Sequence, residues 1–311
     1  MSNTFGTAFR LTSYGESHGV AIGGIVDGCP SGLVIDYDFI DNEMQRRHGT
    51  SHATHRHEKD EIEWMSGIFD GKTLGTPIAF RIANTDQNSQ DYESLSDKYR
   101  PGHADFTYQQ RYKIRDWRGG GRASGRETAV RVAAGAIAKL LLKTKGISIQ
   151  SSVIQTQEST EQDSAGGIVE CRIDGVPAGI GNPIFGKLNA TLAAAVMSIP
   201  SAIGYESGAG FSASNMRGSD FRDEWADNCT TRTNHCGGIQ GGISNGMPIT
   251  FRVAFHPVVT VGEAVNCLTE QGAIESVAIG GRHDRNHVPR TAVVVEAMAA
   301  LAIADSMLLN H

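Results

Sequence analysis

The sequence predicts an α+β fold, a β-α-β sandwich with central helices between antiparallel sheets. Two observations predict it. Three segments recur in the same order in the two halves of the chain, and each set ends in an alanine-rich stretch with apolar residues at helical spacing. We therefore expect a single domain over residues 1–311 that is internally duplicated, with pseudo-repeats at about 1–145 and 165–311.

The first two segments of each set are expected to form hairpin strands. GGIVDGCPSGL (23–33) is echoed by GGIVECRIDGVPAGI (166–180), and GIFDGKTLGTPIAFRIA (67–83) is echoed by GISNGMPITFRVA (242–254). Runs of β-branched residues bounded by Gly and Pro are typical of such strands. Each half is therefore expected to contain strands followed by a helix, and the segments between them are expected to leave the scaffold as loops.

The third segment of each set is expected to form a long helix. RETAVRVAAGAIAKLLL (126–142) parallels RTAVVVEAMAALAIADSMLL (290–309), and their alanine and glycine faces allow close packing between sheets. The C-terminal stretch, 290–309, holds the longest apolar run of the chain, which is interrupted by Glu296 and Asp305. It therefore predicts a buried helix and no membrane span.

Composition narrows the class of protein. The chain of 311 residues is 40% hydrophobic and 20% charged, which is enough for a sizeable core. Its net charge of -6 argues against nucleic-acid binding, including an RNA-binding role for the arginine- and glycine-rich segment, and favours small anions as ligands. Five cysteines without a CxxC pair and an N-terminus without a signal-peptide core predict reduced thiols in the cytoplasm.

The segment RDWRGGGRASGRE (115–127) combines four arginines with four glycines. Glycine lets the backbone approach a ligand closely, and the planar arginine fork matches phosphate and carboxylate oxygens. An isolated run of this kind is more often a solvated loop, so an oxyanion site here depends on the rest of the chain.

Histidines supply the candidate proton donors. YGESHG (14–19) places His18 in a glycine-flanked turn, and RPGHAD (100–105) places His103 near Asp105, which we expect to orient the imidazole. GRHD (281–284) occupies the comparable place in the second half. The histidine-rich segment 48–57 matches no zinc spacing, so we predict no metal site.

Taken together, YGESHG, RPGHADFTY (100–108), RGGGRASGRETAVRVAAGAIAK (118–139) and GRHD resemble the chorismate synthase family. NTDQNSQDY (84–92), VPAGIG (176–181), MRGSDFRDE (216–224) and NHCGGIQGGISNG (234–246) extend the resemblance in order along nearly the whole chain. The resemblance implies a lyase of aromatic amino acid biosynthesis. Such an enzyme eliminates phosphate from 5-enolpyruvylshikimate 3-phosphate to give chorismate, the last step of the shikimate pathway, with reduced FMN and no net redox change.

The resemblance also implies a homotetramer and assigns roles to residues. His18 would protonate the departing phosphate, His103 would hold reduced FMN in its productive charge state, and Asp284 would assist removal of the ring proton. The arginines that match substrate-gripping positions of the family are Arg46, Arg100, Arg126 and Arg282. The residues that match flavin contacts are Arg122, Ala123, Ser124, Gly242, Thr260 and Arg282. Whether NADPH reduces the flavin on this protein or an external reductant does so stays open.

Several positions depart from the family pattern. HPVVT (256–260) stands where the family has KPTSS, Arg285 and Asn286 follow GRHD, and the chain is short between Ser151 and Gly166. These changes gather around the ligands. The alternative hypothesis is therefore an inactive paralogue that binds flavin or a phosphorylated metabolite without turnover, although the retained histidines and arginines favour the enzyme.

Overall fold

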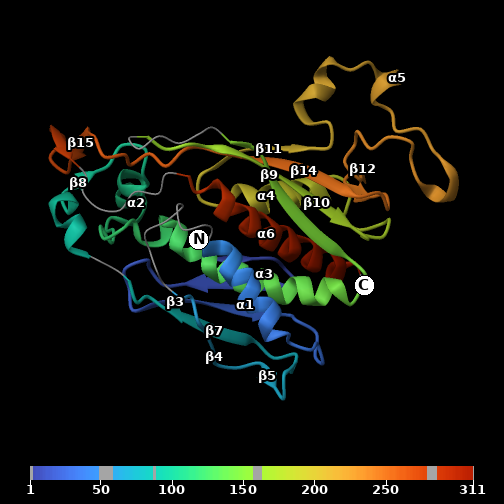
Figure 1. Ribbon diagram of the computed structural model, residues 1–311, viewed down its shortest axis with the longest axis horizontal. Coiled ribbons are helices and arrows are strands. Elements are labelled where there is room, and N and C mark those ends of the chain that lie inside the picture. Colours follow the sequence, from blue (N-terminus) through green and yellow to red (C-terminus); the bar gives the residue numbers. More distant parts are fainter. Residues whose placement is uncertain (1–2, 49–58, 87–88, 157–162, 279–285, 311) are drawn as a thin grey trace.

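Helices separate two antiparallel sheets, and the three layers are visible in Figure 1. The computed structural model describes residues 3–48, 59–86, 89–156, 163–278 and 286–310. The predicted α+β class and the sheet–helix–sheet layering are confirmed.

The first sheet has five strands in the order β1-β2-β3-β7-β4. Alternation along β7 shows which face is buried, because Ile78, Phe80 and Ile82 are fully buried whereas Arg81 points outward. The strands are β1 (Thr4–Phe5), β2 (Arg10–Tyr14), β3 (Ala21–Asp27), β4 (Ile62–Trp64) and β7 (Ile78–Ala83).

The second sheet has four strands in the order β11-β14-β10-β9. In β14 the residues Ile249, Phe251, Val253 and Phe255 are buried, while the residues between them are half-exposed. This alternation turns one face of the sheet toward the helices. The strands are β9 (Ser148–Thr156), β10 (Gly167–Asp174), β11 (Ala202–Ser207) and β14 (Ile249–Phe255).

The middle layer contains α1 (Tyr37–His48), α3 (Thr128–Lys143), α4 (Leu188–Met197) and α6 (Val288–Leu309). The helices α3 and α6 pack closely, since a Cβ atom on Gly135 would lie 2.3 Å from the Cβ of Ala297. The α6 helix is long and apolar enough to cross a membrane, but 83% of its most apolar window is buried inside the protein. The prediction of a buried helix is therefore confirmed.

The two halves share one order of elements. In the first half β2 pairs with β3, α1 follows, β7 pairs with β3, and α3 closes the series. In the second half β9 pairs with β10, α4 follows, β14 pairs with β10, and α6 closes the series. We propose on this basis that the chain is one domain built from two pseudo-repeats, the second of which begins with β9 and therefore before residue 165, where the sequence predicted it.

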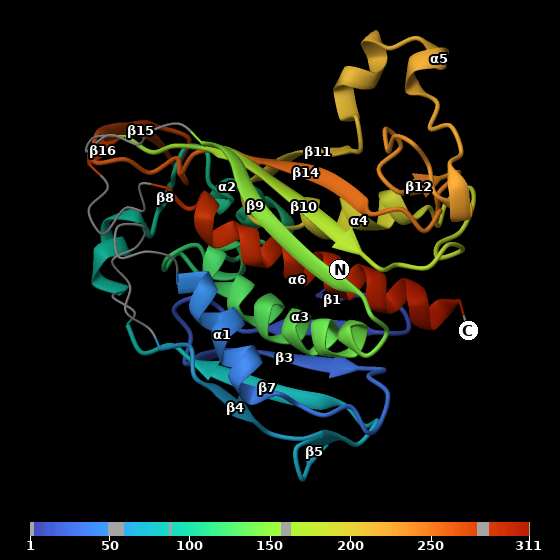
Figure 2. The same ribbon diagram turned by 45° about the vertical axis from the view of Figure 1, so that its right-hand side comes forward.

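Smaller elements extend from this scaffold. Figure 2 shows β8, β15, β16 and α2 beside the N-terminal ends of α3 and α6, whereas the arm that carries α5 projects at the other end. These elements are α2 (Asp105–Tyr112), α5 (Gly218–Phe221), β8 (Lys98–Tyr99), β15 (Ala264–Thr269) and β16 (Ile274–Ala278). Two hairpins complete the strands, β5 (Ile68–Phe69) with β6 (Lys72–Thr73), and β12 (Ile239–Gln240) with β13 (Ile243–Ser244).

Candidate active site

A cavity of about 510 Å³ lies where α3 and α6 begin. Its size is typical of sites for small molecules. Thr128 of α3 and Arg290, Thr291 and Val294 of α6 line it, so the N-terminal turns of both helices face its interior. Helix N-termini attract anions, and this cavity brings two of them together.

The arginine- and glycine-rich segment forms one wall of the cavity. Gly119 and Gly120 line it, together with Ala123, Ser124 and Arg126. Gly119 has a φ of +59°, and a Cβ atom there would lie 2.1 Å from Cε1 of His18. Glycine is therefore required at this position both by the backbone conformation and by the imidazole that packs against it.

His18 is buried and contacts two residues of the cavity wall, Gly119 and Tyr92. Its ring meets the Tyr92 ring edge-on with 5.2 Å between centroids, and its Nδ1 lies 3.0 Å from Oγ of Ser17. The Ser17 hydroxyl also lies 3.4 Å from the carbonyl oxygen of Gly119. When the hydroxyl donates to that carbonyl, it accepts a hydrogen bond from Nδ1 of His18.

His103 lines the same cavity and contacts Thr260. The Nε2 of His103 is 2.5 Å from Oγ1 of Thr260, and both residues line the cavity. The expectation that Asp105 orients this imidazole was wrong. Asp105 instead accepts from Nε and Nη2 of Arg100, at 2.8 and 3.0 Å, because the guanidinium offers it a charged, two-pronged partner.

Burial, reinforced by the positive charge of Arg100, lowers the pKa of His103 to about 4. We therefore expect His103 to stay neutral at pH 6 in the ligand-free protein, and a bound anion to raise this pKa. Because an unfolded histidine binds its proton near pH 6.5, this group makes folding less favourable as the pH falls from about 6.5 toward 4. Proton NMR of the ring, assigned with His103→Gln, measures the midpoint, and a value near 6.5 without ligand would contradict the prediction.

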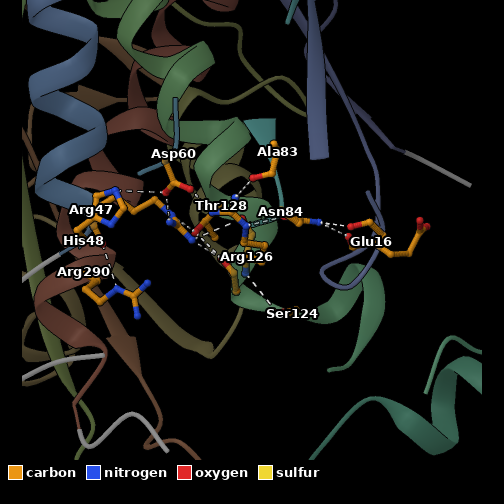
Figure 3. Close-up of polar contacts among 12 residues, drawn as sticks. Glu16, Arg47, His48, Asp60, Ala83, Asn84, Ser124, Arg126, Thr128 and Arg290 are labelled. Carbon is orange, nitrogen blue, oxygen red and sulfur yellow. Dashed lines mark hydrogen bonds and ion pairs between the residues drawn. The ribbon is translucent and has the colours of Figure 1, made fainter. Parts of the chain in front are cut away.

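Arg47 and Arg126 line the cavity around a shared carboxylate, Asp60 (Figure 3). Nη1 of Arg47 donates to Oδ2 of Asp60 at 2.9 Å, and Nη1 of Arg126 donates to Oδ1. All three side chains are at least 95% buried. Together with Arg100 and Arg290, these residues place four arginines against two aspartates, Asp60 and Asp105, among the lining residues that the structure describes.

Arg46 does not join the arginines that line the cavity. Its guanidinium donates to Glu296 at 2.7 and 2.8 Å and to Glu43 at 2.7 Å. Successive residues of an α-helix point about 100° apart, so only one of the two neighbouring arginines at the end of α1 can face the cavity. The structure turns Arg47 to it, and the substrate-binding role predicted for Arg46 does not fit this geometry.

The other predicted residues divide into three groups. Arg100, His103, Ala123, Ser124, Arg126 and Thr260 line the cavity. Arg122 and Gly242 lie elsewhere: Arg122 donates to Ser13 and Gly15 at the end of β2, and Gly242 lies in the turn between β12 and β13. Arg282 and Asp284 fall outside the described residues.

Besides Arg47, the sequence prediction missed four polar residues of this site. Asn84 and Tyr92 lie within a quoted motif, and Arg290 begins a recurring segment, so each carried a signal without an assigned role. Asp60 belongs to no motif, and only its position in the fold shows its partners. Asn84 accepts from Nε of Arg126 at 2.9 Å and donates to the carbonyl oxygens of Glu16 and Gly19, in the turn that carries His18.

Comparisons with known proteins identify the family of this chain. The family model described as "Chorismate synthase" matches residues 9–162 and 153–308. A Flavobacterium psychrophilum protein named chorismate synthase is 45% identical, with 99% of this chain and 98% of that protein covered. A Porphyromonas gingivalis protein of the same name is 46% identical, with 99% and 96% covered. A crystal structure of chorismate synthase matches with a TM-score of 0.76 and 30% identity over 98% of this chain and 93% of that one. The chain belongs to the chorismate synthase family.

Proposed function

We propose that this chain converts 5-enolpyruvylshikimate 3-phosphate to chorismate by 1,4-elimination of phosphate. The observation that carries the proposal is the cavity at the N-terminal ends of α3 and α6, where four arginines outnumber two aspartates. The substrate bears a phosphate and two carboxylates, which both arginine forks and helix N-termini bind well. The near-full-length similarity to proteins named chorismate synthase supports the same reaction.

We assign substrate binding to Arg47, Arg100 and Arg126, with Arg47 in place of Arg46. Burial strengthens their attraction for an anion because few water molecules screen it. The aspartates Asp60 and Asp105 hold these guanidiniums in fixed orientations, so little rearrangement is needed on binding. Arg282 remains a predicted substrate and flavin contact.

His18 is the proposed proton donor to the departing phosphate. A general acid must lie within hydrogen-bond reach of the oxygen that it protonates, and His18 lies directly against the cavity wall at Gly119. Its Nδ1 lies 3.0 Å from Oγ of Ser17, and Nε2 is the nitrogen that we propose for the proton transfer. Asp284 remains the predicted assistant in removal of the ring proton.

The residues of the cavity fit reduced FMN. A Cβ atom on Gly120 would meet Arg100 Nη2 at 3.6 Å and Ser124 N at 4.0 Å, so the backbone there is open to a ligand. Ala123, Ser124 and Thr260 would bind the flavin. His103 would keep the reduced flavin in its productive charge state. The chemistry that bound reduced FMN supplies is a transient electron that helps phosphate to leave, and an acceptor for the ring proton.

We further propose a homotetramer that works in the cytoplasm. All five cysteines are free thiols, which suits a reducing compartment. Large apolar side chains are exposed at the β12–β13 end of the protein and on its arm, namely Phe185, Phe211 and Trp225, and exposed apolar residues of this kind are typical of contact surfaces. Neither nucleic acid nor a membrane is a proposed partner.

The proposed reaction is tested by mixing the protein anaerobically with chemically reduced FMN and the substrate. We expect chorismate, followed by its absorbance, and phosphate in equal amounts, with no product when the flavin is left out. Oxidised FMN with NADPH in a parallel reaction shows whether the protein reduces its own flavin. Folded protein that binds flavin but releases no phosphate would support the inactive paralogue instead.

A further inference from the structure

We infer that Asp60 is a positioning residue of the active site, which sets the orientation of the two cavity arginines Arg47 and Arg126. This inference rests on the proposed function. It assigns a role to a residue that lies outside every motif of the chain.

Asp60 occupies a position where its two oxygens serve two different arginines. Oδ2 accepts from Nη1 of Arg47 at 2.9 Å and Oδ1 accepts from Nη1 of Arg126, while none of the Asp60 side chain is exposed. The backbone of Asp60 has a φ of +52°, a left-handed conformation that aspartate tolerates better than most residues. Such strained backbones persist where the surrounding structure fixes them, and they often occur at functional sites.

Neutral groups hold other edges of the same guanidiniums. Arg47 donates from Nε to Oγ1 of Thr128 at 3.0 Å, and Arg126 donates from Nη2 to the carbonyl oxygen of Ala83 at 3.1 Å. These bonds fix each side chain from the outside, and Asp60 joins the two arginines from between. Moving the carboxylate would therefore move both guanidiniums relative to each other.

The same carboxylate is linked to the turn that carries His18. Arg126 donates from Nε to Oδ1 of Asn84 at 2.9 Å, and Nδ2 of Asn84 donates to the carbonyl oxygens of Glu16 and Gly19 at 3.0 and 2.8 Å. Figure 3 shows this series of contacts from Asp60 to Glu16. A displaced Arg126 would thus disturb both the anion site and the placement of the proton donor.

A simpler role for Asp60 would be to neutralise the arginines. Burial opposes the charge of the Asp60 carboxyl, but the guanidiniums of Arg47 and Arg126 outweigh it and hold its pKa below the usual range. His48 also faces the carboxylate, with its Nε2 at 3.5 Å from Oδ2. The two roles predict opposite changes in anion affinity when the charge of Asp60 is removed. Removing a countercharge strengthens anion binding, whereas displacing the arginines weakens it.

The decisive variant is Asp60→Asn, which keeps the shape and removes the charge. Its amide nitrogen faces an arginine N–H group, so two donors meet and one guanidinium must turn away. We expect kcat/KM to fall by roughly 100-fold with an increase in KM, since a misplacement of about 1 Å can have that effect. We also expect inorganic phosphate, titrated calorimetrically, to bind more weakly although the site has gained positive charge. Tighter phosphate binding with an unchanged kcat/KM would overturn the inference.

Glu63→Gln is the matched control. It removes one negative charge three residues further along the chain, where Glu63 pairs with Arg81 on an exposed surface. We expect its kinetic constants to stay within about twofold of the parent protein, as is usual for exposed pairs. A loss equal to that of Asp60→Asn would show that charge removal in general is responsible, and would overturn the positioning role.

A second variant decides the case if Asp60→Asn does not fold. Asp60→Glu keeps the charge and moves the carboxylate by one methylene, so a positioning role predicts a raised KM and a role in neutralisation predicts none. A structural role would lower the folded fraction, and hence the apparent kcat, without moving KM. If the parent protein produces no chorismate, the proposed function fails, but the phosphate titration still tests whether Asp60 positions the arginines.

Discussion

Replacing His18 with asparagine is expected to lower kcat by about 10²- to 10⁴-fold, the range for loss of a general acid. The asparagine amide can still engage Ser17, as Nδ1 of His18 does at 3.0 Å, but it offers no titratable proton. The arginines proposed to bind the substrate are untouched by this change. We therefore expect KM to stay within severalfold while the rate of phosphate release collapses.

The proposed acid role also predicts how kcat changes with pH. A histidine acts as an acid only while it is protonated, so kcat of the parent protein is expected to fall with rising pH. The His18→Asn variant should lose that limb of the profile, because the titrating group is gone. Anaerobic stopped-flow measurement of phosphate release across pH 5–9 records both properties.

His235→Asn is the matched control for the loss of a histidine. His235 lies on the arm, where its Nδ1 is 3.4 Å from Asp223, and it is absent from the described residues that line the cavity. We expect this variant to keep the kcat and the pH profile of the parent. Retention of more than about a tenth of kcat in His18→Asn would show that another group protonates the phosphate.

The fold could be predicted because its signals are local and occur twice. Alternating apolar residues in 78–83 and 249–255 mark strands, and the alanine-rich stretches mark helices whose small side chains permit contact, as Gly135 and Ala297 show. Because these segments recur in the same order, the sequence also predicted two matching sets of elements. The cavity forms largely from the segments that interrupt the repeats, as the sequence led us to expect, since loops on a rigid scaffold usually carry the chemistry.

Contacts between distant segments could not be predicted in the same way. Arg46 and Arg47 are adjacent and chemically identical, and only the packing of α1 against α3 and α6 decides which faces the cavity. Asp105 is near both His103 and Arg100 in sequence. It pairs with the arginine because two charge-assisted hydrogen bonds outweigh one to a neutral ring. Asp60 meets Arg126 across 66 residues of chain, a distance over which the sequence gives no guidance.

The second large effect is expected on the stability of the fold, when Lys139 is replaced. This lysine is buried on α3, and its Nζ donates to Glu43 of α1 and to Glu296 of α6. Replacing it with methionine leaves two buried carboxylates to share Arg46. We expect Lys139→Met to lower the free energy of unfolding by about 3–5 kcal/mol, the usual cost of removing one partner from a buried ion pair.

Lys143→Met provides the comparison, because it makes the same exchange one turn further along α3 at an exposed position. Its effect on the free energy of unfolding is expected to stay within about 0.5 kcal/mol, as for most surface substitutions. Urea denaturation at pH 7 measures both variants. A cost below about 1 kcal/mol for Lys139→Met would show that Arg46 alone compensates the two carboxylates.

The stability at acid pH provides an independent measure of the ion pairs among Lys139, Glu296 and Arg46. Burial opposes the charge of Glu296, but the hydrogen bonds from Arg46 and the charge of Lys139 outweigh it and lower its pKa to about 2. An unfolded glutamate titrates near pH 4.3, so this group stabilises the fold above that pH, and the contribution is lost as the pH falls toward 2. Lys139→Met raises the pKa of Glu296 toward its unfolded value, and its unfolding free energy should therefore depend less steeply on pH between 4.5 and 2. The same slope in both proteins would mean that Lys139 contributes little to holding Glu296 ionised, and that the cohesion of α1, α3 and α6 depends on Arg46 instead.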